Sequence, residues 1–217
     1  MPPSRAGGRN RRRVRPLKTR ILVCTEGRVT EPDYLNNLRR KLRQAPVAIE
    51  IDPAHGDPLF LVRRASEVLS ETRRARRRGS ANEGFDQVWC VVDVDDHPRL
   101  QAAKELAARE SIPLVISNPC FEVWALLHFE ECTAYLGRGD AARRLRAHIP
   151  EYEKALSTQL LDGKFALAKQ RAVTLREFHQ DGGVDARSNP STEVFLLVDA
   201  IITVALAKGY QVDPTAL

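Results

Sequence analysis

Short apolar segments alternate with longer amphipathic segments between residue 21 and about residue 129, and this alternation restricts the folds open to the chain. The apolar runs have the length and composition of strands, and they cover residues 21–25, 47–51, 88–92 and 112–116. Each run is followed by a stretch whose apolar residues recur with the period of a helix. The pattern predicts βαβ crossovers and therefore an α/β fold: a mainly parallel sheet of about four strands flanked by helices.

The pattern changes in the last third of the chain, where helical periodicity continues without convincing strands. The predicted helices cover residues 139–148, 151–161, 163–180 and 190–208. We therefore expect an α/β core over residues 20–135 and a helical C-terminal region, residues 136–217, packed on that core.

The first residues form a basic arm that we expect to be disordered by itself, because it is rich in Arg, Gly and Pro. Residues 1–20 contain eight basic and no acidic side chains, which accounts for the whole net charge of +6. The arm, assigned to residues 1–19, is suited either to binding nucleic-acid phosphates or to keeping the protein in solution. A second basic run, Arg73 to Arg78, either complements the end of a helix or forms another phosphate-binding patch.

The four cysteines and the apolar segments indicate a cytoplasmic protein with no membrane association. The cysteines show no Cys-x-x-Cys spacing and are too few for a disulfide framework in a chain of 217 residues. The N-terminus lacks the apolar segment of a signal peptide. The longest apolar stretch, Val194 to Ala207, is interrupted by Asp199 and is shorter than the ~20 residues that span a bilayer.

Acidic residues follow two of the predicted strands. Glu26 follows the first strand, and Asp93, Asp95 and Asp96 follow the third. Ligands of parallel α/β sheets bind outside the carboxyl ends of the strands, so these side chains are expected to converge. Their hard oxygen atoms suit Mg²⁺ or Mn²⁺, and such an ion can activate water or polarise a phosphate.

Other polar residues near the predicted strand ends have either a functional or a structural interpretation. Asn118 and Glu122 follow the fourth strand and are candidates for contacting substrate, but Glu122 also suits the first turn of a helix. Asp57 and Asp96 are equally suited to capping the helices that begin at Pro58 and Pro98. Thr30 and Asp33 resemble a capping box.

The histidines give weaker indications. His55 and His97 are candidates for contacting phosphate or carrying a proton, and both are also compatible with ordinary loop positions. His128 lies in an apolar helical segment and is expected to be packed. The sequence has no Gly-rich phosphate loop, nucleophile elbow or His-Glu-x-x-His pair, which argues against an NTPase, a serine hydrolase and a zinc protease.

Five separated motifs resemble those of the RloB family. The first is Ile21 to Gly27 together with Thr30 to Tyr34. The others cover residues 88–97, 117–124, 152–154 and 189–192. RloB-like proteins are similar to Toprim domains, in which a glutamate after the first strand and an Asp-x-Asp after a later strand hold Mg²⁺. The resemblance carries these roles to Glu26, Asp93 and Asp95.

The resemblance implies a metal-dependent nuclease from a restriction or phage-defence locus, often encoded beside an ATPase of the AAA or ABC type. Lys154 would then neutralise the scissile phosphate, although a lysine on a helix is usually just solvated. Asn189, in the last motif, is a further candidate for contacting substrate or supporting the site. Two alternatives remain: a non-catalytic module that binds nucleic acid through its basic segments, and a subunit regulated by its ATPase partner.

Overall fold

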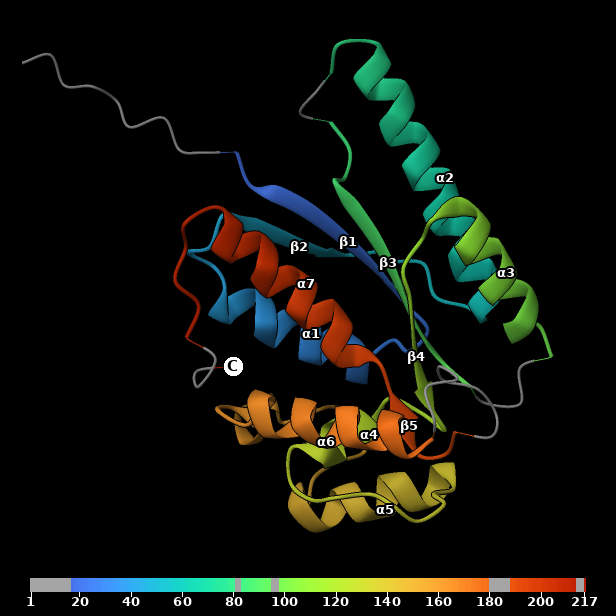
Figure 1. Ribbon diagram of the computed structural model, residues 1–217, viewed down its shortest axis with the longest axis vertical. Coiled ribbons are helices and arrows are strands. Elements are labelled where there is room, and N and C mark those ends of the chain that lie inside the picture. The colour runs from blue at the N-terminus through green and yellow to red at the C-terminus, as the bar shows by residue number, and fades with distance from the viewer. Residues whose placement is uncertain (1–16, 81–82, 95–97, 180–187, 214–216) are drawn as a thin grey trace, which may run out of the picture.

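The computed structural model describes residues 17–80, 83–94, 98–179, 188–213 and 217. Its strands form one sheet in the order β2-β1-β3-β4-β5 (Figure 1). Their bounds are β1 Thr19–Thr25, β2 Val47–Ile51, β3 Gln87–Asp93, β4 Leu114–Asn118 and β5 Ser191–Thr192. The first four pair in parallel with one another, as the alternating pattern predicted, and β5 is antiparallel to β4.

Helices cover both faces of this sheet (Figure 1). In the α/β part they are α1 Thr30–Lys41, α2 Pro58–Arg77, α3 Leu100–Glu110 and α4 Glu122–Leu127. The C-terminal part adds α5 Arg138–His148, the short 3-10 helix η1 Thr158–Leu161, α6 Phe165–Phe178 and α7 Val194–Ala207. None of the helices in the described ranges is long and apolar enough to cross a membrane.

Strand β1 is apolar along its length because it contributes to two cores at once. Ile21 and Val23 pack with residues of α1, α4 and α7 on one face of the sheet. Leu22 and Cys24 pack with residues of α2 and α3 on the other face. A strand buried on both faces is typical of parallel sheets, which explains why the predicted strands were continuous apolar runs. All four cysteines are buried free thiols within these packed regions.

The predicted helix over residues 151–161 is wrong, apart from the single 3-10 turn of η1. Residues 152–157 form an irregular segment across the start of α1. The hydroxyl of Thr30 donates to the carbonyl oxygen of Lys154 at 2.8 Å, and Asp33 accepts a hydrogen bond from the Leu156 amide at 2.9 Å. These long-range bonds satisfy the backbone in place of a helix. Lys154 therefore lies in a loop with a φ of 132°, and not on a helix.

The same contacts correct the predicted capping box, because Thr30 and Asp33 both bond to the 152–157 segment and neither caps α1. Asp57 does cap α2, where its carboxylate accepts from the amides of Leu59 and Phe60. The predicted last helix is shortened at its start by β5. Ser117 and Thr192 hydroxyls bond across β4 and β5 at 2.8 Å, and this two-residue pairing left no apolar pattern in the sequence.

Candidate active site

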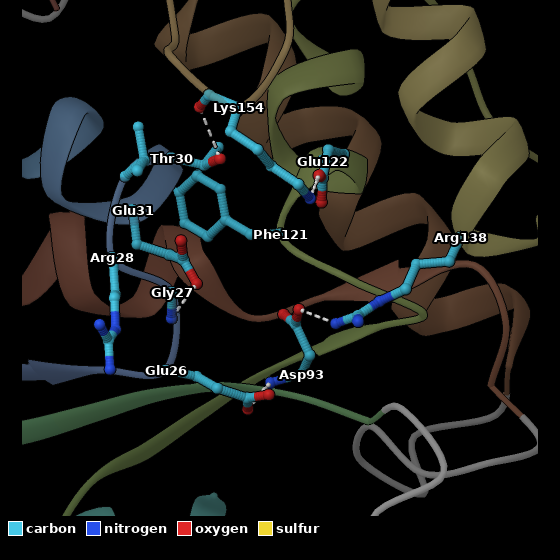
Figure 2. A pocket seen from close by; sticks show the side chains of 11 residues that line it. Glu26, Gly27, Arg28, Thr30, Glu31, Asp93, Phe121, Glu122, Arg138 and Lys154 are labelled. Carbon is cyan, nitrogen blue, oxygen red and sulfur yellow. Dashed lines mark hydrogen bonds and ion pairs between the residues drawn. The ribbon is translucent and has the colours of Figure 1, made fainter. Parts of the chain in front are cut away.

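A cavity of about 280 Å³ opens where β1 and β3 end (Figure 2). Its walls come from segments far apart in the sequence. They are the β1–α1 turn, residues 26–31, together with Asp93, Phe121, Glu122, Arg138 and Lys154. Four carboxylates and three cations thus surround one small space, which is the arrangement expected of a site for charged ligands.

Glu26 and Asp93 meet at the carboxyl edge of the sheet, as the strand pattern predicted. Glu26 continues the pairing of β1 with β3, since its amide donates to the carbonyl oxygen of Val91 at 3.1 Å. Its carboxylate Oε2 accepts a hydrogen bond from the Asp93 amide, also at 3.1 Å. The two acidic residues come from neighbouring parallel strands, and their contact depends on that adjacency.

Asp93 is a buried carboxylate in a negative environment. Burial raises its pKa well above the ordinary value, and the nearby charges of Glu31 and Glu26 raise it further. Arg138 opposes this effect, because its guanidinium lies 2.8 Å from Asp93 Oδ2. A buried, crowded carboxylate of this kind is stabilised by any cation that enters the cavity.

Glu31 is a wall residue that the sequence interpretation missed. It is buried, and its Oε1 accepts a hydrogen bond from the Gly27 amide at 2.9 Å. Burial raises the pKa of Glu31, and the backbone hydrogen bonds offset only part of that rise. The sequence interpretation used this segment as a helix start and as part of a family motif, but gave Glu31 itself no role.

Glu122 and Lys154 form the opposite wall. Glu122 Oε1 accepts hydrogen bonds from the Tyr152 hydroxyl at 2.7 Å and from Lys154 Nζ at 3.0 Å. Burial opposes the charged form of Glu122, but these bonds and one from Cys120 outweigh it and lower the pKa of the carboxyl. Burial likewise opposes the charge on Lys154, and the bond to Glu122 outweighs it and raises the pKa of the ammonium. Glu122 is also the first residue of α4, so its structural interpretation is confirmed, and its contact with substrate stays a prediction.

Arg138 and Arg28 are the other cations of the cavity, and neither was singled out from the sequence. Arg138 is the first residue of α5 and reaches Asp93 from the side of the C-terminal region (Figure 2). Arg28 lies exposed in the β1–α1 turn. A cation in the first turn of a helix is disfavoured by the helix dipole, and this is a sequence signal that points to another role for Arg138.

The remaining predicted site residues lie outside the cavity wall. The Asn189 side chain accepts a hydrogen bond from the Leu136 amide and donates one to the Leu136 carbonyl oxygen. Its amide nitrogen also donates to Asn118 Oδ1 at 3.3 Å. Both asparagines therefore support the loop that leads to Arg138. His55 Nδ1 lies 3.1 Å from the carbonyl oxygen of Thr25, beneath the turn. His128 is buried beside Trp124, as expected.

Three of the predicted site residues, Asp95, Asp96 and His97, lie outside the described residues. So does most of the predicted basic arm, residues 1–16.

The carboxylates fit a hard divalent cation by their chemistry. Within the described ranges, no group of three or more His, Cys, Asp or Glu side chains is arranged to hold one metal ion. Mg²⁺, however, is commonly held by one or two carboxylates and keeps several water molecules. Glu26 and Asp93 supply two carboxylates, and a bound cation would favour the charged form of Asp93, whose pKa is raised by burial and by the neighbouring carboxylates.

The fold and the cavity together define an α/β protein with an acidic pocket at the carboxyl edge of a mainly parallel sheet. The family model described as RloB-like protein matches residues 21–201. Since this match spans most of the chain, the protein belongs to the RloB-like family, and the resemblance predicted from its motifs is confirmed. No curated protein and no solved structure matches the chain significantly. The likeness to Toprim domains stays a prediction.

Proposed function

We propose that the protein is a Mg²⁺- or Mn²⁺-dependent, Toprim-like nuclease that hydrolyses phosphodiester bonds of DNA or RNA, with Glu26 and Asp93 as metal ligands. One observation carries the proposal: acidic side chains that end two neighbouring parallel strands meet in a cavity that also contains cations. Asp95 and Asp96, which lie two and three positions after the end of β3 in the sequence, are further candidate ligands.

In this proposal the acidic side chains of the cavity bind the metal ion and the basic side chains bind phosphate. When bound, the cation would polarise a phosphate oxygen and make a water molecule easier to deprotonate. Lys154 and Arg28 offer positive charge to a phosphodiester at the mouth of the cavity. Tyr152 and Glu122 hold the Lys154 ammonium at its place, because the Glu122 carboxylate is itself fixed by the Tyr152 hydroxyl. The Asn189 and Asn118 pair supports the wall that carries Arg138.

A cleavage assay with a matched pair of variants tests this function. Labelled single-stranded DNA, duplex DNA and RNA are incubated with the wild type, Asp93→Asn and Asp140→Asn in Mg²⁺, Mn²⁺ or EDTA. Asp140 is a partly exposed residue of α5 that pairs with Arg143 and does not line the cavity, so its variant is the control.

We expect the wild type and the control to cut in the presence of metal. Asp93→Asn is expected to lose about 100-fold or more, since a metal contribution of several kcal/mol is lost. Cutting by Asp93→Asn at the wild-type rate would contradict the assignment of the site.

The biological setting is proposed from the family alone. RloB-like proteins are associated with restriction and phage-defence loci, so we propose an antiphage role with an ATPase of the AAA or ABC type as partner. Co-purification of the two proteins from cells that express both tests the partnership, and recovery of only the free chain would count against it.

A second candidate, a non-catalytic nucleic-acid-binding module, is favoured by the exposed basic end of α2. Arg73, Arg74, Arg77 and Arg78 are all exposed there. Binding through them would weaken with salt by counterion release and would survive EDTA. Replacing all four by Gln is expected to reduce the slope of log affinity against log salt by about 0.7–0.9 for each lost phosphate contact. An unchanged slope would exclude this surface.

A further inference from the structure

We propose that Arg138 occupies the cation position on Asp93 until a divalent ion enters the cavity, and that its guanidinium then binds the phosphodiester. The inference rests on the proposed function and deepens it, because it assigns a phosphate-positioning role to a residue outside the predicted metal set. It also makes metal binding and phosphate binding favour one another.

The geometry of the ion pair supports an exchange of partners. Arg138 Nη2 lies 2.8 Å from Asp93 Oδ2. The Asp93 side chain is only 9% exposed, whereas that of Arg138 is 48% exposed. The carboxylate is therefore the fixed partner, and the more exposed guanidinium extends toward it (Figure 2). Release of Arg138 therefore moves an exposed side chain of α5 and not the buried strand end that carries Asp93.

Electrostatics favour competition between Arg138 and a divalent ion for the Asp93 carboxylate. Asp93 lies among Glu26, Glu31 and Glu122, so a cation at its carboxylate stabilises the folded site. Arg138 brings one positive charge and a divalent ion brings two. The two cations repel each other at this short range, so an ion on Asp93 weakens the hold of Arg138 on the same carboxylate.

The backbone keeps Arg138 beside the cavity after its side chain is released. Asn189 accepts from the Leu136 amide at 2.8 Å and donates to the Leu136 carbonyl oxygen at 3.0 Å. Asn189 also bonds to Asn118 at the end of β4. This anchor fixes the chain just before Arg138, so the released guanidinium stays at the cavity mouth. Its planar fork of donors matches the oxygens of a phosphodiester.

Lys154 provides an internal contrast. It bonds to Glu122 at 3.0 Å, but Glu122 also receives a hydrogen bond from Tyr152 at 2.7 Å. Lys154 can therefore turn to a phosphate while the carboxylate remains hydrogen-bonded. Arg138 is the cation that is paired with the candidate metal ligand itself, which is why the coupling is assigned to Arg138.

The test measures Mn²⁺ affinity without nucleic acid, by calorimetric titration of the wild type, Arg138→Gln and Arg143→Gln. Arg143 is an exposed residue of the same helix that pairs with Asp140 and does not line the cavity, so it controls for loss of charge. We expect Arg138→Gln to bind Mn²⁺ about fivefold or more tightly than the wild type, in the usual range of coupling between sites, and Arg143→Gln to match the wild type. Arg138→Lys, which keeps the charge, serves as a second variant and is expected to lie between them.

A second arm measures binding of a phosphorothioate oligonucleotide in saturating Mn²⁺. Arg138→Gln is expected to bind it about fivefold or more weakly than the wild type, because a phosphate contact is lost. Equal Mn²⁺ affinity in the wild type and Arg138→Gln would overturn the exchange while leaving a metal-dependent nuclease intact. Absence of Mn²⁺ binding in both proteins would overturn the proposed metal site and the exchange together.

Discussion

Gly27 shows how closely the backbone approaches an acidic side chain at this site. Its amide donates to Glu31, and a Cβ added at Gly27 would overlap the Glu31 carboxylate. Only a residue without a side chain leaves the carboxylate where it is. The turn that follows Glu26 is therefore shaped by a steric requirement as well as by a hydrogen bond.

Substituting Gly27→Ala should displace Glu31 and the turn. We expect the free energy of unfolding to fall by about 1–3 kcal/mol and cleavage to fall about tenfold or more, because the acidic groups lose their alignment. Denaturant unfolding and the cleavage assay measure the two effects. Gly139→Ala is the control, since nothing lies within 4 Å of its added Cβ. Full activity in Gly27→Ala would show that the position of Glu31 does not matter.

His128 gives the protein a pH-dependent stability. Burial lowers the pKa of this imidazole to about 4, although its bond to the Trp124 carbonyl oxygen opposes the shift. Since the folded-state pKa lies below that of the unfolded chain, the contribution is complete above the unfolded pKa and is lost as the pH falls toward the folded pKa.

The wild type should therefore lose about 2 kcal/mol more than His128→Gln between about pH 7.5 and about pH 5. Urea unfolding of both proteins at the two pH values measures this difference. Gln is chosen because its amide can still donate to the Trp124 carbonyl oxygen but does not titrate. Parallel pH profiles for the two proteins would mean that His128 is not protonated on unfolding in this range.

Among the elements, the irregular segment 152–157 explains why a helix was wrongly predicted there and how Lys154 comes to line the cavity. Tyr152 and Leu156 are spaced like residues on one face of a helix, and both are buried. The apolar periodicity reflects the burial of these two side chains. It does not reveal the hydrogen bonds that Thr30 and Asp33, more than 120 positions away in the sequence, make with the segment. The segment instead crosses α1 as a loop and holds Lys154 over the cavity.

Removing the carboxylate with Asp33→Ala should loosen this segment. We expect the free energy of unfolding to fall by about 1–2 kcal/mol, from the lost hydrogen bond and the lost acid in the first turn of α1. Amide exchange at Leu156 should become faster, and cleavage should fall as Lys154 loses its position. Asp33→Asn keeps an acceptor for the Leu156 amide and should restore slow exchange. Unchanged exchange in Asp33→Ala would show that other contacts hold the segment.

Across the whole molecule, contacts that follow from the order of strands and helices were predictable from the sequence, and contacts that depend on tertiary packing were not. The parallel strands and the meeting of Glu26 with Asp93 were predictable, because strand ends converge whenever the strands are parallel. The contact of Arg138 with Asp93 was not, because it depends on how the C-terminal region packs on the sheet. The same is true of β5, whose two polar residues pair with β4 from more than 70 positions away in the sequence.

Charge is also separated along the sheet. The cavity with four carboxylates lies where the parallel strands end. A second cavity of about 370 Å³, at the start of β1, is lined by four cations and one carboxylate: Lys18, Arg20, Arg76, Lys208 and Asp86. The chain at residues 17–20 and the end of α2 lie at this opposite side (Figure 1). Basic side chains therefore gather at the opposite end of the sheet from the carboxylate-lined cavity.

The most direct test of the proposed metal site is a titration of Mn²⁺ into the wild type, Glu26→Gln and Asp93→Asn. Electron paramagnetic resonance measures the free and bound ion at each step. We expect about one tightly bound ion per wild-type chain and at least about tenfold weaker binding in each variant, because each loses a carboxylate ligand. Wild-type affinity in both variants, or no binding by the wild type, would contradict a metal site formed by Glu26 and Asp93.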